Sequence, residues 1–159
     1  MIPELGHIAL ILALLLATAQ AVFPLAGSLT GNRPWMTMAR PLAYGQLVFV
    51  AIAFLALVEA FLTSDFSVHY VAVNSNSLLP DIYKFSAVWG GHEGSLLLWA
   101  LMMAGWGAAV AVFSRYLPLP VVARVLGVMG LVAIGFLLFM LLTSNPFERL
   151  FPVPPEGRD

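Results

Sequence analysis

Long runs of apolar residues alternate with short polar connections along this chain. Four of these runs have about the ~20-residue length that a helix needs to cross ~30 Å of hydrocarbon. Prolines and arginines punctuate the connections between the first and second runs and between the third and fourth. The pattern predicts an all-α, polytopic transmembrane helical bundle with four spans, at about residues 5–25, 42–62, 95–113 and 125–142.

Composition supports a membrane protein. Hydrophobic residues make up 61% of the 159 residues, charged residues make up 9%, and the mean hydropathy is +0.95. A soluble domain could not bury that much apolar surface. The net charge of −1 and the lack of a basic tract argue against nucleic-acid binding. Because there is no cysteine, any metal or haem chemistry would have to use His, Met or carboxylates.

Arginines predict the orientation. The connections after the first and third spans carry Arg33, Arg40, Arg115 and Arg124 and no acidic residue. By the positive-inside rule these connections face the cytoplasm. Both termini are then expected outside (N-out/C-out), together with a long outer loop at about residues 63–94. The residues before the first span lack the basic segment of a secretory signal, so that span is expected to be retained.

Small residues recur at four-residue spacing on the predicted spans. Such stripes let helices pack closely in lipid. They predict a packed bundle and require no ligand. The positions are Ala9, Ala13, Ala17 and Ala21 in the first span, Ala100, Ala104 and Ala108 in the third, and Ala123, Gly127 and Gly135 in the fourth.

The junction between the outer loop and the third span carries the most unusual residues, and we call residues 89–99 the rim segment. Its glycines would allow a tight turn, a positive φ or close approach of the backbone to a ligand. A serine near the start of the span is expected to cap the helix, while a histidine and a glutamate lie where water gives way to lipid. The candidate residues are Trp89, Gly90, Gly91, His92, Glu93, Gly94, Ser95 and Trp99.

Two simpler interpretations stay open beside this one. His7, His69 and His92 are the only histidines and all are predicted at or beyond the outer face, where loop histidines are often merely solvated. Trp99 shares a helix face with Met103 and Trp106, a stripe that is more typical of packing or of an interfacial belt than of a cofactor wall. No complete catalytic constellation is present in the sequence.

Four stretches together resemble a known family: residues 1–7, 75–80, 83–89 and, above all, 89–99. They are similar to the cytochrome c-type biogenesis protein CcmF, a haem lyase component, and to its relative NrfE. The resemblance implies a multi-pass protein of the bacterial inner membrane. It also implies that haem is taken from the haem chaperone CcmE and is attached, with CcmH-type partners, to apocytochrome c through thioether bonds.

This chain departs from the family in length, since family members are several-fold longer. The tryptophan-rich periplasmic segment with its flanking histidines is missing, and so are the later helices that hold the family's haem b. We therefore assign no haem ligand to this chain and expect a fragment, a truncated reading frame or one piece of a split protein. The expectation is an N-terminal scaffold (residues 1–159) that is unlikely to be active alone.

A different class of function stays open. A small membrane interaction or transport subunit could use outer-face polar groups to line a cavity. Paired broken helices or several intramembrane charges would favour transport. Only Glu59, about one turn below the outer surface, approaches that description.

Overall fold

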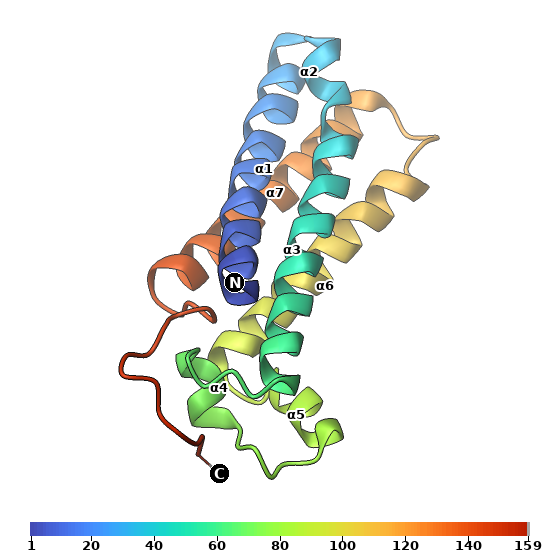
Figure 1. The fold of residues 1–159 in the computed structure, drawn as a ribbon. Coiled ribbons are helices and arrows are strands. Elements are labelled where there is room, and N and C mark those ends of the chain that lie inside the picture. Colours follow the sequence, from blue (N-terminus) through green and yellow to red (C-terminus); the bar gives the residue numbers. More distant parts are fainter. Residues whose placement is uncertain (159) are drawn as a thin grey trace.

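The computed structural model describes residues 1–158, which form a bundle of four long helices capped at one end by short helices and loops (Figure 1). The four long helices are apolar and long enough to cross a membrane. The predicted all-α transmembrane bundle is thus confirmed. The helices are α1 (Ile2–Thr30), α2 (Arg33–Thr37), α3 (Ala39–Leu62), α4 (His69–Asn74), α5 (Asp81–Ala87), α6 (His92–Phe113) and α7 (Leu119–Leu142).

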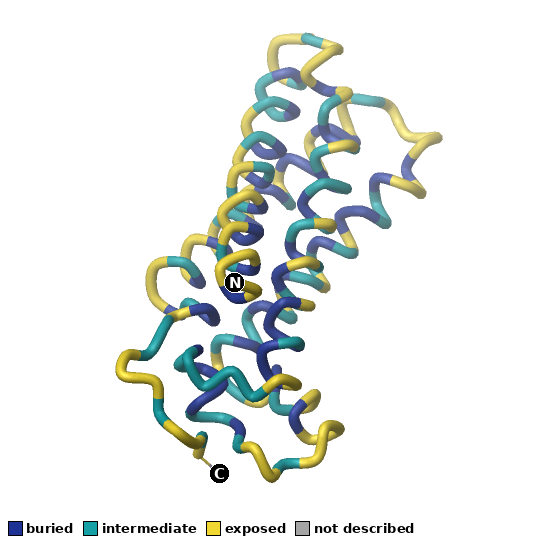
Figure 2. The backbone as a smooth tube through the Cα atoms, in the orientation of Figure 1, coloured by how far each residue is buried: buried dark blue, intermediate teal, exposed yellow. Residues whose placement is uncertain are grey.

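The long helices pack in a ring. Helix α1 packs against α3 and α7, and α6 packs against the same two helices. Buried residues face the centre of the bundle and exposed residues follow its outer faces (Figure 2). The small-residue stripes predicted on the first and third spans are confirmed as core positions. The buried members are Ala9, Ala13, Ala17, Ala21, Ala100, Ala104 and Ala108.

Helix α7 approaches α1 through a glycine that the predicted stripe did not include. A Cβ on Gly130 would lie 2.9 Å from the Ala21 amide nitrogen and 3.0 Å from the Ala17 carbonyl oxygen. Only a residue without a side chain lets the two backbones come this close. Gly127 also faces α1, against Leu25, but Gly135 points into open space. Including Gly135 in the packing stripe was therefore wrong.

The helix ends explain why the helices are longer than the predicted spans. Gly31 ends α1 in the left-handed conformation, at φ 75°. Helix α7 begins at Leu119, because Pro118 is its N-cap and Pro120 lies in its first turn. Prolines in a first turn do not cost a hydrogen bond. Pro118 and Pro120 thus mark the start of α7, whereas the sequence pattern predicted only a break between the third and fourth spans. Pro24 lies inside α1, which continues through it.

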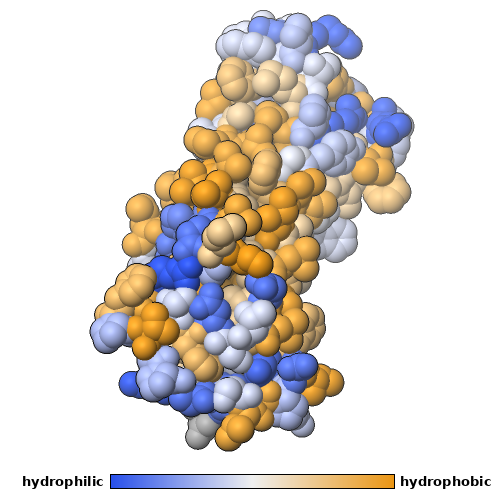
Figure 3. All heavy atoms as spheres, viewed as in Figure 1, coloured by the Kyte–Doolittle hydropathy of each residue, from blue (hydrophilic) through white to orange (hydrophobic). Residues whose placement is uncertain are grey.

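The connections divide between the two ends of the bundle as the arginine pattern requires. Helix α2 and the turn between α6 and α7 lie at one end, whereas the α4–α5 region and the C-terminal tail lie at the other (Figure 1). On the face shown in Figure 3, an apolar surface separates the two polar ends. Arg149, in the tail, pairs with Glu4 at the start of α1, so the N-terminus also belongs to the tail end. Which end faces the cytoplasm stays a prediction.

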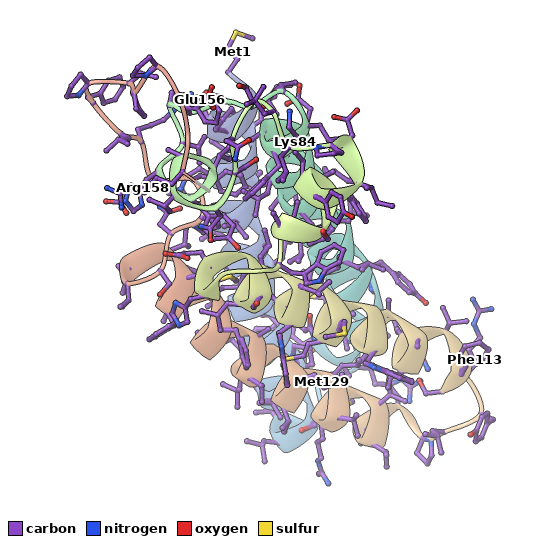
Figure 4. The ribbon with its side chains drawn as sticks, turned by 90° about the horizontal axis from the view of Figure 1, so that it is seen from below. Met1, Lys84, Phe113, Met129, Glu156 and Arg158 are labelled. Atoms are coloured by element: carbon purple, nitrogen blue, oxygen red, sulfur yellow. The ribbon has the colours of Figure 1, made fainter. Side chains whose placement is uncertain are left out.

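The long outer loop is folded, and we call residues 63–91 together with 143–158 the outer layer. Its tail, residues 143–158, crosses α4 and is fixed to it by backbone hydrogen bonds. The His69 amide donates to the Glu148 carbonyl, the Leu150 amide to the Ser67 carbonyl and the Arg158 amide to the Ala72 carbonyl, each at 2.8 Å. Figure 4 shows Lys84 on α5 and Glu156 and Arg158 on the tail in this layer.

Candidate functional site

The rim segment turns directly from α5 into α6. Helix α6 begins at His92, three residues before the predicted span, and its N-cap is Gly91 in an extended conformation (φ −109°, ψ 177°). The expected capping by Ser95 is therefore wrong. Ser95 lies in the first turn, and its Oγ donates to the Trp89 carbonyl at 2.6 Å. Ser95 thus ties the helix back onto the turn that precedes it.

A buried tyrosine from α4 holds this turn in place. Tyr70 is only 2% exposed, and its ring packs edge-on against Phe61 of α3, with centroids 5.3 Å apart. Its Oη accepts a hydrogen bond from the Gly91 amide at 2.9 Å and donates to the Val88 carbonyl, also at 2.9 Å. One hydroxyl therefore satisfies both sides of the turn and joins α4 to the start of α6.

Burial of the Tyr70 hydroxyl disfavours its ionised form. Burial raises the pKa of Tyr70, and the negative charge of Glu93 raises it further, whereas the neighbouring amides of Gly91 and Gly94 oppose that rise. The hydroxyl is therefore present as a neutral donor and acceptor around neutral pH. That state is the one in which it can make both hydrogen bonds of the turn.

Two rim glycines are needed for close approach. A Cβ on Gly91 would lie 2.6 Å from Cε2 of Tyr70, and a Cβ on Gly94 would lie 1.6 Å from the Val88 carbonyl oxygen. At Gly90 the nearest atom would be 3.4 Å away, an ordinary contact. Neither glycine has a positive φ, since Gly31 is the only glycine with one among residues 1–158. The positive φ expected in the rim turn is therefore wrong.

The two charged rim residues lie at the start of α6. His92 is exposed; its Nδ1 lies 3.1 Å from Ser144 Oγ, and its ring meets Phe139 edge-on, with centroids 6.0 Å apart. Glu93 is half-buried in the first turn of the helix, where a negative charge suits the helix dipole. His92 thus contacts the end of α7, while Glu93 acts electrostatically on Tyr70.

The tryptophans of the rim segment face outward. Trp89 is 36% exposed and stacks edge-on with Phe85 of α5, at a centroid distance of 5.2 Å. Trp99 is 58% exposed on α6, and Trp106 on the same helix is 70% exposed. Trp99 and Trp106 therefore do not line an internal pocket. Its exposure suits contact with lipid or with further protein.

Each of the three histidines contacts the segment that follows α7, but they do not share one site. Asn145 Nδ2 lies 3.2 Å from His7 Nδ1, and Ser144 lies beside His92. His69 contributes its backbone amide to Glu148. Among residues 1–158, no group of three or more His, Cys, Asp or Glu is arranged to hold a metal ion.

Two outer cavities each contain a single histidine. An open cavity of about 430 Å³ lies between the start of α1 and the tail, with His7, Glu4 and Arg149 in its wall. A smaller cavity of about 250 Å³ lies between α4 and the tail and is lined in part by His69 and Arg158. Neither cavity offers the two opposed histidines that would clamp a haem iron from both faces.

Arg149 holds three parts of the outer layer together. Its guanidinium pairs with Glu4 of α1 and bonds to Ser67, and Nη1 lies 3.7 Å from Asp65 Oδ2. The Glu4 carboxylate also meets the N-terminal amine at 2.8 Å. The start of α1, the loop between α3 and α4 and the tail are thus joined by one side chain.

Sequence reasoning singled out the rim glycines but missed Tyr70 and Ser144. Tyr70 lies within residues 68–73, a short stretch that is apolar apart from His69, and nothing local marks it. A signal was available in principle, because a buried tyrosine needs a partner for its hydroxyl and a glycine turn offers free backbone groups. Only the folded arrangement identifies that partner.

Comparison with known proteins identifies relatives over the whole chain, although no family model matches. The chain is 62% identical to the cytochrome c-type biogenesis protein CcmF of Pseudomonas aeruginosa and 54% identical to that of Escherichia coli. It is 42% identical to the cytochrome c-type biogenesis protein NrfE of Haemophilus influenzae. Each alignment covers 100% of this chain but only 24 to 25% of the relative. The chain thus spans about a quarter of the length of these relatives.

A solved structure agrees with the sequence matches. The structure described as cytochrome c haem lyase CcmF superposes with a TM-score of 0.88 at 29% sequence identity. The match covers 93% of this chain and 25% of that chain. The helix arrangement described above is therefore shared with that quarter of the solved protein.

Proposed function

Since this chain belongs to the CcmF family of cytochrome c-type biogenesis proteins, we propose that it acts in cytochrome c maturation as the N-terminal membrane scaffold of a haem lyase. In this proposal haem is the substrate. It is received from a haem chaperone of the CcmE type and is attached, with CcmH-type subunits, to apocytochrome c. In this proposal, this chain forms part of the outer surface on which these partners bind.

The joint between Tyr70 and the rim glycines carries the proposal. It fixes the start of α6 to α4 through buried hydrogen bonds and close backbone contacts, so the rim segment has one defined geometry. A surface that receives a large ligand or a partner benefits from such rigidity, because less ordering is needed on binding. The exposed tryptophans at its edge offer large apolar contact area.

The residues of this chain do not by themselves fit a haem site. Its three histidines come from three different helices, and the outer cavities that involve them contain one histidine each. We therefore propose no step in which this chain ligates the haem iron. Haem handling would depend on parts of the family protein that lie outside this quarter.

The membrane orientation belongs to the same proposal. The segments that carry Arg33, Arg40, Arg115 and Arg124 are α2, the start of α3, the α6–α7 turn and the start of α7. These segments lie at one end of the bundle, and the outer layer lies at the opposite end (Figure 1). With the arginines on the cytoplasmic side, the outer layer and the rim segment lie on the periplasmic side of a bacterial inner membrane. That is the side on which the proposed partners would be met.

A chimera tests the proposal directly. Residues 1–158 of this chain would replace the aligned quarter of the Escherichia coli relative, in a strain that lacks its own copy. We expect holo-cytochrome c to form, as measured by haem staining at matched membrane levels of chimera and native protein. A matched chimera with Gly94→Val should form little holo-cytochrome c, because the added side chain clashes with the Val88 carbonyl oxygen. A chimera that accumulates normally but yields no holo-cytochrome would contradict the proposal.

A further inference from the structure

Two glutamine side chains lie inside the transmembrane bundle. Gln20 of α1 is 1% exposed and Gln46 of α3 is 5% exposed. Gln20 lies ten residues before the end of α1 at Thr30, which places it ~15 Å from that end of the helix. At this depth lipid offers no hydrogen-bond partner, so the amides must be satisfied within the protein.

Gln20 is satisfied on one side only. Its Nε2 donates to the Leu126 carbonyl of α7 at 2.7 Å, a contact made possible by the close approach of α1 and α7 at Gly130. Its Oε1 is buried and accepts no hydrogen bond from any group within residues 1–158. A buried carbonyl oxygen without a donor is costly, and such groups usually mark a bound water or ion.

The two glutamines line the same small cavity. Met103 and Gly107 of α6 and Met129 of α7 also line it. The space that the centre of a water molecule can occupy is about 10 Å³, close to what one water requires. The cavity is too small for a lipid tail or a planar cofactor. Its amides distinguish it from the apolar cavities that stay dry.

We propose that one water molecule is bound between Gln20 and Gln46 in the interior of the bundle. The water donates a hydrogen bond to Gln20 Oε1 and a second bond links it to the Gln46 amide. Because Gln20 also holds Leu126, the water completes a polar clamp across α1, α3 and α7. The clamp fixes the relative position of three helices whose remaining contacts are almost entirely apolar. It concerns the bundle interior and is independent of the proposed function.

The two methionines give a direct readout. X-ray radiolysis splits a bound water into hydroxyl radicals, which oxidise methionines beside it to the sulfoxide. With the full chain in membrane vesicles, we expect Met103 and Met129, which are half-buried beside the cavity, to be oxidised several-fold faster than the more exposed Met102 and than Met140, which is wholly buried outside the cavity. Lipid-facing Met102, 47% exposed, reports any general change in radical access.

Two variants test whether the glutamines hold the water. In Gln46→Leu, oxidation of Met103 and Met129 should fall several-fold while that of Met102 is unchanged. Gln20→Leu should give the same result, and Gln46→Leu keeps the test available if loss of the Leu126 contact prevents folding. Oxidation of Met103 and Met129 no faster than that of the more exposed Met102 in the unaltered protein would overturn the proposal. Unchanged oxidation in a folded Gln46→Leu protein would overturn it as well.

Discussion

The Tyr70 hydroxyl lies 2.9 Å from the Gly91 amide nitrogen, and through this bond α4 fixes the N-terminal end of α6. The two residues are 21 positions apart in the sequence, yet each requires the other. Gly91 must lack a side chain to admit the tyrosine ring, and the buried hydroxyl needs the amide that Gly91 exposes. Several consequences of this joint can be measured.

Replacing Tyr70 by Phe keeps the ring and its contact with Phe61 but removes the hydroxyl. The Val88 carbonyl and the Gly91 amide would then lose their partner, and an unsatisfied buried group costs ~1 to 3 kcal/mol. We expect a lower unfolding midpoint for Tyr70→Phe in purified, detergent-solubilised protein. Tyr83→Phe is the matched control, because Tyr83 is 60% exposed. Equal stability of the two variants would argue against the joint.

The same tyrosine gives a pH prediction. Because burial raises the pKa of Tyr70 above its ordinary value of 10.0, the folded protein holds this proton more tightly than the unfolded chain. The stability that the hydroxyl contributes is fully present below pH 10 and is lost as pH rises through the raised pKa. The stability difference between the unaltered protein and Tyr70→Phe should therefore shrink in alkaline denaturation series above pH 10. A difference that grows with pH would contradict this assignment.

The tail makes an acid-sensitive contact with the outer loop. The Ser77 amide donates to Glu156 Oε1 at 2.8 Å, and the Gly157 amide does so at 3.0 Å. Hydrogen bonds from the Ser77 hydroxyl and amide lower the pKa of Glu156 below its ordinary value of 4.5. This contact is present above pH 4.5 and is lost as pH falls through the lowered pKa.

Hydrogen exchange measures the tail contact. At pH 6 the Glu156→Gln variant should show less protection of the Ser77 and Arg158 amides than the unaltered protein. At a pH below the lowered pKa the two proteins should exchange alike. Glu148→Gln serves as the control, since Glu148 is exposed and holds α4 through its backbone carbonyl. Equal protection at pH 6 would show that the carboxylate does not hold the tail.

The sequence was sufficient to predict the four long helices but not how these helices are rotated against one another. The apolar runs and the alanine stripes predicted four helices and their buried faces, because lipid imposes length and close packing on any spanning helix. Interhelical geometry decided the rest. Gly130, rather than Gly135, meets α1, and that choice depends on how α7 is rotated against α1. The periodicity of a uniformly apolar helix does not encode this rotation.

The rim segment illustrates the same limit at the level of single residues. The glycines were recognised from their density, and their predicted role was a tight turn, a positive φ or close approach to a ligand. The structure shows no positive φ there and a close approach to Tyr70 and Val88 of the same chain. Ser95 was predicted as a cap from its position before an apolar run, although the helix begins earlier, at His92. Both errors arise because the deciding contacts come from α4 and from the α5–α6 turn, which only the folded chain brings together.

Fusions of alkaline phosphatase test the predicted topology. The enzyme is active only outside the cytoplasm, so a fusion after Asn76 in the outer layer should be active. Fusions after Gly31 or Leu119, at the arginine-bearing end, should be inactive at equal expression. The reverse pattern would place the rim segment in the cytoplasm and remove the basis of the proposed partner surface.

Absorption spectroscopy tests the expectation that this chain does not ligate haem by itself. The purified chain should hold no stoichiometric haem b and should not attach haem to an apocytochrome, because its histidines do not converge on one site. His7→Ala, His69→Ala and His92→Ala should each leave the absorption spectrum of haem-exposed protein unchanged. A spectrum at one haem per chain that disappears in one of these variants would identify that histidine as an axial ligand.

The rim segment is expected to act through geometry more than through proton transfer at His92, and three substitutions separate the two. Gly91→Val would force a side chain to within 2.6 Å of the Tyr70 ring, and overpacking of this kind typically costs ~1 to 3 kcal/mol. In a full-length relative that carries this segment, Gly91→Val should lower holo-cytochrome yield at least as much as His92→Ala. Gly90→Ala is the matched control, because its Cβ would make only an ordinary contact at 3.4 Å. Yields are compared at equal membrane levels, so that lost folding is distinguished from lost activity. If Gly91→Val matures cytochrome normally while His92→Ala abolishes maturation, the geometric account fails and His92 takes part in the chemistry.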